Sequence, residues 1–480
     1  MKIAFVASEI TPFAKTGGLA DVAAALPRTL HHMGHELCVF MPLYARVRNG
    51  SFALRAVPDL QNVPLKIGEQ TYHFSVLSAV MPASDLTVHL IDCPELFARS
   101  SIYTADADEH RRFIMLQRAA LESMNIMEFS PEILHCNDWH TALLPLLLKT
   151  RYSNHLLFRR TRTVMSIHNI GYQGIFPASA MLDLGIDDVM GHIRHEDRSN
   201  GQINWLKEGI VQADVVSTVS PTYAHEICIP AGGYGLDTTL RARGDAVIGI
   251  LNGVDYHSWN PETDNTLPAR YTIDDLSGKA KCKQALLALG KLDAGDDLPV
   301  VGLVSRLAHQ KGIGLLMDSL PGLLRTRNFA LCVLGSGDPQ YVEFFNQLMQ
   351  EYPQRVYFRN GYDESLAHLI EAGSDMFLMP SLYEPCGLNQ MYSLKYGTIP
   401  IVRNTGGLAD SVQMWDGRNG TGIVFNDYDA PAVNWAMNTA LDLYRQPAVW
   451  QQLIRNGMSQ DFSWEKQALR YQQLYQQLLA

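Results

Sequence analysis

The sequence Thr-Gly-Gly-Leu-Ala-Asp occurs twice in this chain, at residues 16–21 and again at residues 405–410. Each copy follows an apolar, strand-like run, Ile-Ala-Phe-Val-Ala at 3–7 before the first and Thr-Ile-Pro-Ile-Val at 398–402 before the second. A glycine pair between a strand and a helix lets the backbone approach a ligand closely, with helix N–H groups pointing at it. The repeat therefore predicts two nucleotide-type α/β domains that face one another.

The composition is that of an ordinary globular protein, with 47% hydrophobic and 18% charged residues. A length of 480 residues favours two or more domains, each large enough for its own core. The formal net charge of −10, without any block rich in Lys and Arg, argues against nucleic acid or anionic membranes as general partners. The most apolar stretch, residues 143–148, is far too short to cross a bilayer.

Cysteine usage and the N-terminus predict a cytoplasmic location. The seven cysteines lie far apart and include no Cys-x-x-Cys pair, so neither a disulfide framework nor a zinc site is expected. The chain runs from Met1 straight into a short strand pattern, whereas a secretory signal would have a longer apolar region and a cleavage site. We therefore expect a reduced, cytoplasmic protein.

Short apolar runs alternate with helix-length segments, which indicates buried parallel sheets. The first domain, residues 1–245, has expected strands at 2–8, 35–42, 131–137, 161–167 and 214–219 and helices near 18–33, 140–151 and 202–213. The second domain, residues 246–460, has expected strands at 299–305, 329–335, 355–360, 375–380 and 398–403 and helices near 313–325, 339–351, 364–372 and 389–396. Both are typical of doubly wound, Rossmann-like sheets, and a final helix within residues 461–480 is expected to cross back to the first domain.

Ligands of such sheets sit at the carboxyl ends of the strands, so residues that follow strands are the candidates for a site. In the second domain, Arg306 and Lys311 follow one strand and can neutralise a diphosphate without a metal. Glu384, within Ser-Leu-Tyr-Glu-Pro-Cys-Gly-Leu, follows another and can bind sugar hydroxyls or balance positive charge in a transition state. Solvated surface charges are the alternative for all three residues. The turn that begins at Gly335 is favoured as structural.

In the first domain, Asn-Asp-Trp-His at 137–140 and Ile-His-Asn at 167–169 each end an expected strand. Polar groups there suit sugar recognition, and Trp139 offers an apolar face for a pyranose ring. For any single histidine, burial with a hydrogen bond is the commoner outcome. Asn204 and Lys207 lie one helical turn apart and are expected to share a helix face.

Two Asp-x-Asp strings, at 106–108 and 427–429, could hold a divalent cation for phosphate chemistry. Both lie in polar, loop-like sequence, away from the strand ends. We interpret them as solvated turns and predict no metal site.

Taken together, these motifs and Asn-Gly-Val-Asp at 252–255 closely resemble the bacterial glycogen synthase and plant starch synthase family. The resemblance covers essentially the whole chain, with the motifs in the family's order. It implies the two-domain glycosyltransferase B fold with a central cleft. It also implies a retaining ADP-glucose:α-1,4-glucan glucosyltransferase that extends glycogen or malto-oligosaccharides at the non-reducing 4-OH, with no metal and no pyridoxal phosphate. The lack of a transit peptide before Met1 favours the bacterial branch.

The resemblance also implies roles for individual residues. The donor phosphates would lie near the first glycine loop, and Thr405 and Gly406 would close around them. Arg306 and Lys311 would stabilise the departing ADP. Tyr362 would flank the adenine. The glucosyl unit would contact Asp138 and His168 from the first domain, and Glu384 with the 386–388 backbone from the second. The expected catalytic residues are Asp138, His168, Arg306, Lys311 and Glu384. The expected substrate-binding residues are Lys15, Gly17, Gly18, Asp21, Asn169, Asn204, Lys207, Asn252, Gly335, Tyr362, Cys386, Gly387, Leu388, Thr405 and Gly406.

Several alternatives stay open. Many retaining enzymes of this fold carry a second Glu eight positions after the first, and here that position is Tyr392. Retention can proceed through a carboxylate nucleophile or by same-face attack, and we favour the second because no carboxylate stands out as a nucleophile. The rival functions are the same transfer from UDP-glucose, a glucan phosphorylase that needs pyridoxal phosphate, and a catalytically silent glucan-binding protein.

Overall fold

The structure is a computed structural model, and it describes residues 1–186, 188–193, 199–293, 295 and 298–480. The chain forms two compact units. The first comprises residues 1–219, 224–253 and 464–480, and the second comprises residues 220–223 and 254–463. The chain thus leaves the first unit after Gly253 rather than after residue 245. The reason is that strand β12 (Val247–Gly249) pairs in parallel with β11 (Val215–Thr218) and extends the first sheet.

The main sheet of the first unit has the strand order β12-β11-β8-β7-β1-β2-β6-β5-β3, with β4 paired to β5. The strands from β12 to β6 run parallel, as predicted for a doubly wound domain. Those not yet given are β1 (Lys2–Val6), β2 (Glu36–Pro42), β6 (Thr87–Asp92), β7 (Ile133–Asn137) and β8 (Arg162–Ile167). A separate pair joins β9 (Ile175–Pro177) and β10 (Gln202–Asn204).

The other edge of this sheet is antiparallel, which the sequence analysis missed. Strand β5 (Gln70–Val80) pairs antiparallel with β6, with β4 (Val63–Ile67) and with the short β3 (Arg55–Ala56). Buried and more exposed residues alternate along β5 because a sheet edge has one solvated face. An alternating pattern is weaker than the continuous apolar runs that identified the central strands.

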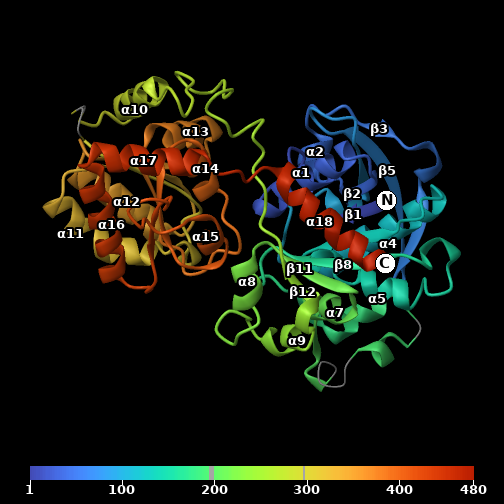
Figure 1. Cartoon of the computed structure of the whole chain (residues 1–480). Coiled ribbons are helices and arrows are strands. Elements are labelled where there is room, and N and C mark those ends of the chain that lie inside the picture. The colour runs from blue at the N-terminus through green and yellow to red at the C-terminus, as the bar shows by residue number, and fades with distance from the viewer. Residues whose placement is uncertain (187, 194–198, 294, 296–297) are drawn as a thin grey trace. The chain divides into compact units, whose positions relative to one another are not determined.

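The helices of this part of the chain are α1 (Gly18–His32), α2 (Ala45–Arg48), α3 (Pro94–Phe97), α4 (Glu109–Ile126), α5 (Leu144–Lys149), α7 (Trp205–Gln212), α8 (Pro221–Glu226), α9 (Asp237–Arg241) and α18 (Trp464–Leu479). The C-terminal helix α18 lies beside α1 (Figure 1). Its buried Tyr475 hydroxyl hydrogen-bonds Nδ1 of His135 on β7 at 2.6 Å. The final helix therefore belongs to the first unit's core although it follows the whole second unit in sequence.

The second unit is an all-parallel sheet in the order β15-β14-β13-β16-β17-β18. The strands are β13 (Val300–Val304), β14 (Ala330–Gly335), β15 (Val356–Asn360), β16 (Met376–Met379), β17 (Ile399–Arg403) and β18 (Ile423–Phe425). Its helices are α10 (Ser277–Gly290), α11 (Ile313–Thr326), α12 (Pro339–Glu351), α13 (Glu364–Gly373), α14 (Asn389–Lys395), α15 (Gly406–Ser411), α16 (Ala430–Tyr444) and α17 (Pro447–Met458). Their buried apolar faces join the sheet in one core, which is the doubly wound arrangement that the sequence predicted.

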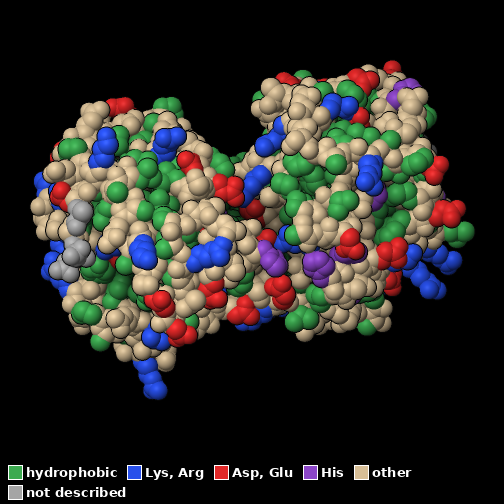
Figure 2. All heavy atoms as spheres, turned by 90° about the horizontal axis from the view of Figure 1, so that it is seen from above, with side chains coloured by type: hydrophobic (Ala, Val, Ile, Leu, Met, Phe, Trp, Pro, Cys, Tyr) green, Lys and Arg blue, Asp and Glu red, His purple; other side chains and the backbone are tan. Residues whose placement is uncertain are grey.

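The surface carries charges of both signs. On the face drawn in Figure 2, Lys and Arg side chains are interspersed with Asp and Glu side chains. All seven cysteines carry free thiols. Within the described part of the chain, every helix is too short or too polar to span a bilayer.

Candidate active site

A buried glutamate, Glu9, holds the first glycine loop through hydrogen bonds. The Glu9 carboxylate accepts hydrogen bonds from the Thr16 hydroxyl at 2.6 Å, from the Thr16 and Gly17 N–H groups, and from the Tyr103 hydroxyl. Above this anchor, a Cβ added at Gly17 or Gly18 would meet no atom within 4 Å. The loop is therefore fixed in place, and its glycines face open space. Sequence reasoning missed Glu9, whose partners lie seven or more positions away.

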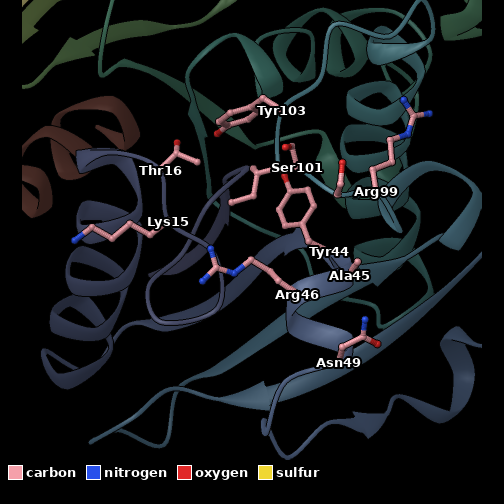
Figure 3. Close-up of a pocket in the computed structure, with 11 residues that line it drawn as sticks. Lys15, Thr16, Tyr44, Ala45, Arg46, Asn49, Arg99, Ser101 and Tyr103 are labelled. Carbon is pink, nitrogen blue, oxygen red and sulfur yellow. The ribbon is translucent and has the colours of Figure 1, made fainter. Parts of the chain in front are cut away.

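Lys15 and Asp21 flank this loop and form an exposed ion pair at 2.7 Å. Beside them lies a cavity of about 560 Å³, a size usual for small-molecule sites. In Figure 3, Tyr44, Tyr103 and Arg46 surround this space, while the charged ends of Lys15 and Arg99 point outward on either side. The whole lining is Lys15, Thr16, Tyr44, Ala45, Arg46, Asn49, Arg99, Ser100, Ser101, Ile102 and Tyr103.

Two predicted site residues of the first unit meet at the carboxyl ends of β7 and β8. The Asp138 carboxylate accepts the His168 backbone N–H at 2.7 Å. Nε2 of the His168 ring lies 2.9 Å from Oδ1 of Asn137, whose amide nitrogen donates to the Val6 carbonyl. Because Oδ1 can only accept, Nε2 carries the proton and Nδ1 presents a lone pair.

This lone pair has no partner in the structure. The His168 side chain is buried, and burial lowers its pKa to about 3, so the ring is neutral at pH 7. Nδ1 is buried without a hydrogen-bond partner, which is rare for a polar atom. The arrangement suits a ligand whose hydroxyl group donates a hydrogen bond to Nδ1 of His168.

Asp138 itself carries two signs of a functional position. Burial raises its pKa to about 7, although the N–H groups of His168 and Asn169 favour the charged form. Its backbone has a φ of 56°, a conformation that residues other than glycine rarely adopt. Such strain is concentrated at active sites and ligand clamps.

Two further predictions in the first unit need correction or comment. Trp139 offers no free face for a sugar, because His140 lies 3.9 Å from its ring and Gly174 packs against it. The structure places Asn204 one position before α7 (Trp205–Gln212), so only Lys207 lies within the helix. Asn204 is the N-cap of α7, and its side chain accepts the Lys207 N–H at 3.0 Å.

Asn252 and Asn169 follow strands β12 and β8 of the first unit. Asn252 was assigned to the second domain but lies in the first unit, where its buried Oδ1 has no hydrogen-bond partner. Asn169 follows His168, and its side chain accepts the Gly171 N–H at 2.9 Å, which closes a tight turn. Both residues therefore lie shortly after the end of a strand of the first sheet.

In the second unit, the residues after β13 form the predicted basic turn. Arg306 is exposed, and its guanidinium donates to Oε1 of Gln310 at 3.4 Å. Lys311 ends a short 3-10 turn before Gly312, whose φ is 72° and whose added Cβ would lie 2.0 Å from the Pro380 carbonyl oxygen. Only glycine fits there, so the turn holds β13 and the chain after β16 close together.

This turn brings together two predicted catalytic residues. The Lys311 ammonium lies 2.6 Å from Oε2 of Glu384, and the Ser381 hydroxyl donates to the same oxygen at 3.0 Å. Both side chains are mostly buried, with 18% and 7% of their surface exposed. Sequence reasoning placed them at the same sheet edge but did not predict that they form an ion pair.

The second glycine loop packs directly against the Glu384 segment. A Cβ at Gly406, where φ is 44°, would lie 1.9 Å from the Glu384 carbonyl oxygen, and one at Gly407 would lie 2.1 Å from the Cys386 carbonyl oxygen. The Gly407 N–H donates to Glu384 O at 3.1 Å. Thr405 and both glycines are buried, so this copy supports the backbone of 384–386 in the structure. Its contact with a phosphate stays a prediction.

The remaining predicted binding residues are spread over the carboxyl edge of the second sheet. Gly335 ends β14, and an added Cβ would lie 2.1 Å from Ser305 O, which explains the glycine. Tyr362 follows β15 with 76% of its surface exposed. Residues 386–388 precede α14, where Gln390 binds the Cys386 and Gly387 carbonyls.

Tyr392, at the position of the second Glu in related enzymes, belongs to an aromatic stack. Its ring lies parallel to Trp259 at 3.9 Å, and His368 covers the other face of the indole at 3.7 Å. His368 and Tyr396 bind the buried Asp264 carboxylate at 2.6 Å each. This stack holds α14, so Tyr392 has a packing role in place of a carboxylate.

Both carboxylates of the Asp-x-Asp string at 106–108 form ion pairs with one arginine. Arg99 contacts Asp106 at 2.6 Å and Asp108 at 2.6 Å. Among the residues that the structure describes, no three His, Cys, Asp or Glu side chains gather in a metal-binding arrangement.

Comparison with known proteins places these features in a family. The family model of the starch synthase catalytic domain matches residues 2–242, and that of glycosyl transferases group 1 matches residues 289–457. A glycogen synthase of Anaeromyxobacter dehalogenans strain 2CP-C is 45% identical over 484 residues, covering 100% of both chains. The chain belongs to the glycogen and starch synthase family. A glycogen synthase of Syntrophotalea carbinolica is 42% identical over 99% of this chain and 98% of its own.

Solved structures agree with this family assignment. The catalytic domain of starch synthase IV from Arabidopsis thaliana, bound to ADP and acarbose, superposes with a TM-score of 0.92 at 35% identity and 99% coverage of both chains. Sucrose-phosphate synthase from Thermosynechococcus elongatus shares the fold, with a TM-score of 0.62 at 18% identity. The fold is therefore glycosyltransferase B, and this member of the glycogen synthase family is a glycosyltransferase that elongates glucan in glycogen synthesis.

Proposed function

We propose that the chain transfers glucose from ADP-glucose to the non-reducing 4-OH of an α-1,4-glucan, with retention of configuration. The proposed reaction uses neither a metal ion nor pyridoxal phosphate. The observation that carries the choice of donor is the likeness over 99% of the chain to a starch synthase whose structure holds ADP and acarbose. The free thiols and the bacterial relatives support a cytoplasmic location.

The leaving group defines the role of the second unit's cations. Breaking the bond between glucose C1 and the phosphate oxygen sends an electron pair to the ADP diphosphate. Arg306 is exposed at the carboxyl edge of the sheet, and Lys311 is held 2.6 Å from Glu384. Positioned cations stabilise negative charge as it develops, which is the work that metal ions do in other phosphate sites.

The first unit supplies groups for the sugar and the donor phosphates. His168 accepts a hydrogen bond from a sugar hydroxyl through Nδ1, which has no partner in the structure. The first glycine loop offers N–H groups at the start of α1 with open space above Gly17 and Gly18. The cavity beside Lys15 and Thr16 adds room for a ligand at this loop.

Retention is assigned to same-face attack, in which the acceptor 4-OH bonds to C1 on the side that ADP leaves and passes its proton to the departing diphosphate. Glu384 is already paired with Lys311, and Asp138 accepts backbone N–H groups. Neither carboxylate is left as a free nucleophile. Mass spectrometry of enzyme quenched during turnover tests this point, since a glucosyl group found on an Asp or Glu would contradict same-face attack.

The direct test is glucose transfer to glycogen by the purified chain in the presence of EDTA, with ADP-glucose and UDP-glucose compared as donors. Strong transfer from ADP-glucose supports donor, reaction and metal independence together. Transfer from UDP-glucose alone would overturn the choice of donor, and transfer restored only by added metal would overturn the metal-free mechanism. Absorbance characteristic of a bound pyridoxal group would favour a phosphorylase, and failure with both donors would favour a glucan-binding protein.

A further inference from the structure

Two loops of the first unit present exposed aromatic and aliphatic side chains. Tyr172 lies in the turn that follows His168 and Asn169, and 55% of its surface is exposed. Tyr234 lies in the segment between α8 and α9, and 49% of its surface is exposed. Ile175, which begins β9 after the first of these turns, and Ile229, between α8 and α9, are similarly exposed. Large apolar side chains gathered on adjoining loops mark interaction sites more often than single ones do.

The two loops are joined by one glutamine. The Gln173 side-chain amide donates to the carbonyl oxygen of Tyr234 at 3.0 Å and to that of Ile170 at 3.0 Å. Its oxygen accepts from the Asn204 side chain, and its own carbonyl accepts the Leu206 N–H at 3.1 Å. Tyr172 and Tyr234 are therefore carried by backbone segments that are fixed relative to each other.

Tyr234 is also strained. Its φ of 48° is in the left-handed region, which costs an L residue about 1 kcal/mol or more. The neighbouring Gly235, with φ of 84°, adopts that region without cost. A bulky side chain kept in a strained turn is typical of a functional position.

The Tyr172 turn directly follows the end of β8 that carries His168. Tyr172 is four residues after His168, whose buried Nδ1 lacks a partner and suits a hydroxyl donor. The Asn169 turn connects the two positions. The four exposed side chains are uncharged, which suits a neutral ligand. Pyranose rings present apolar C–H faces that stack on tyrosine rings, while the phenol hydroxyl stays in water.

We propose that Tyr172 and Tyr234 form a platform that binds the α-1,4-glucan acceptor beyond its terminal glucose. The proposal rests on the glucan transfer proposed above and adds a specificity for chain length. A glucan long enough to reach the platform gains affinity, and maltose does not. The platform contacts sugar rings away from the reacting atoms, so it acts on acceptor binding.

The test measures KM for maltohexaose and for maltose with Tyr172→Ala, Tyr234→Ala and the double variant. Each single change is expected to raise KM for maltohexaose about threefold to tenfold, because one aromatic contact is lost. KM for ADP-glucose, kcat and KM for maltose stay near wild type. Tyr172→Phe and Tyr234→Phe are expected to retain affinity, since stacking needs the ring and not the hydroxyl.

A matched control is Leu156→Ala, which removes an apolar side chain that is 82% exposed elsewhere in the first unit. It is expected to leave both acceptor constants unchanged. Retardation of the same variants in glycogen-containing native gels gives a second readout that does not depend on catalysis.

An unchanged KM for maltohexaose in the double variant would overturn the platform. A change in molecular mass by size exclusion without an acceptor effect would overturn it too and assign the tyrosines to a contact between proteins. Absence of glucan transfer by the wild-type chain is a separate result, because it contradicts the proposed function rather than the platform.

Discussion

The two copies of Thr-Gly-Gly-Leu-Ala-Asp follow parallel strands and begin helices, yet their surroundings differ. In the first copy, Gly17 and Gly18 are exposed, and an added Cβ would touch nothing. In the second, Gly406 and Gly407 are buried against the carbonyl oxygens of Glu384 and Cys386. One sequence thus forms an open loop in one unit and a packing support in the other.

The aspartates that end the two copies differ in the same way. Asp21 pairs with Lys15 in an exposed contact. Asp410 accepts both the N–H and the hydroxyl of Thr222, at 2.8 and 2.7 Å, and so fixes the start of α8. A local motif therefore specifies a strand–turn–helix, while the neighbouring segments decide whether it binds a ligand or another part of the chain.

The largest difference between the copies is expected for alanine at the equivalent first glycines. Gly406→Ala would place Cβ 1.9 Å from Glu384 O at a φ of 44°. Overpacking and strain together predict a loss of several kcal/mol, and a melting temperature lower by about 5 °C or more. Gly17→Ala keeps an extended φ of −155° in open space and should melt like wild type. Thermal melting of both variants is the measurement, and equal melting temperatures would remove the distinction.

The ion pairs near the two loops provide a second contrast. Lys311→Met leaves Glu384 buried without its cation, and removing one partner of a buried pair costs about 3–5 kcal/mol. Lys15→Met breaks an exposed pair, for which about 1 kcal/mol or less is expected. Denaturant melts of the two variants compare these losses. Turnover should fall about 10²–10³-fold for Lys311→Met by analogy with a lost oxyanion donor, and a loss of only a few-fold would reject its leaving-group role.

A pH test addresses the buried carboxylate of Asp138 in the first unit. Asp138 accepts backbone N–H groups, and burial raises its pKa to about 7 against an ordinary value near 3.9. The folded state therefore holds this proton more tightly than the unfolded chain. The resulting stability is fully present below about pH 4 and is lost as pH rises through about 7.

Asp138→Asn removes this titration. Relative to the variant, wild type should lose melting temperature between pH 5 and pH 8. The same melts with Asp21→Asn provide an exposed control, which should follow the wild-type pH dependence. Parallel curves for wild type and Asp138→Asn would contradict the raised pKa.

The smallest contrast concerns the aspartates of the two copies. Asp410→Asn weakens two hydrogen bonds to Thr222, and a charged hydrogen bond contributes about 1.5–3 kcal/mol. Asp21→Asn should change stability by about 1 kcal/mol or less because its pair is exposed. Chemical denaturation measures both, and a larger loss for Asp21→Asn would reverse the assignment of the supporting copy.

Local patterns were enough to predict much of the fold. Apolar runs and glycine turns located the central parallel strands and both glycine loops, and the last helix was expected to return because it follows the completed second sheet. The antiparallel strands around β5 were missed because an edge strand alternates instead of forming an apolar run. The domain boundary was placed too early because the pairing of β12 with β11 is not visible in the sequence.

The sequence predicted which residues lie at the strand ends of the candidate site, but it did not predict which of them contact one another. Asp138, His168, Lys311 and Glu384 were found because they follow strands. The Lys311–Glu384 pair and the Glu9 anchor depend on residues brought together by folding. Trp139 was taken as a sugar-stacking face because its motif is polar, yet folding packs Phe113 and Phe176, which are distant in sequence, against its ring.

The central claim is that the first glycine loop binds the donor while the second supports Glu384. Calorimetric titration with ADP of the wild-type chain and Gly17→Val tests it most directly. Valine fits the empty space and the extended backbone, so folding should be unchanged, while its side chain occupies the place of a phosphate. The account predicts a melting temperature equal to wild type with ADP affinity weakened at least about tenfold, or 1.4 kcal/mol. Wild-type ADP affinity in the folded variant would contradict it.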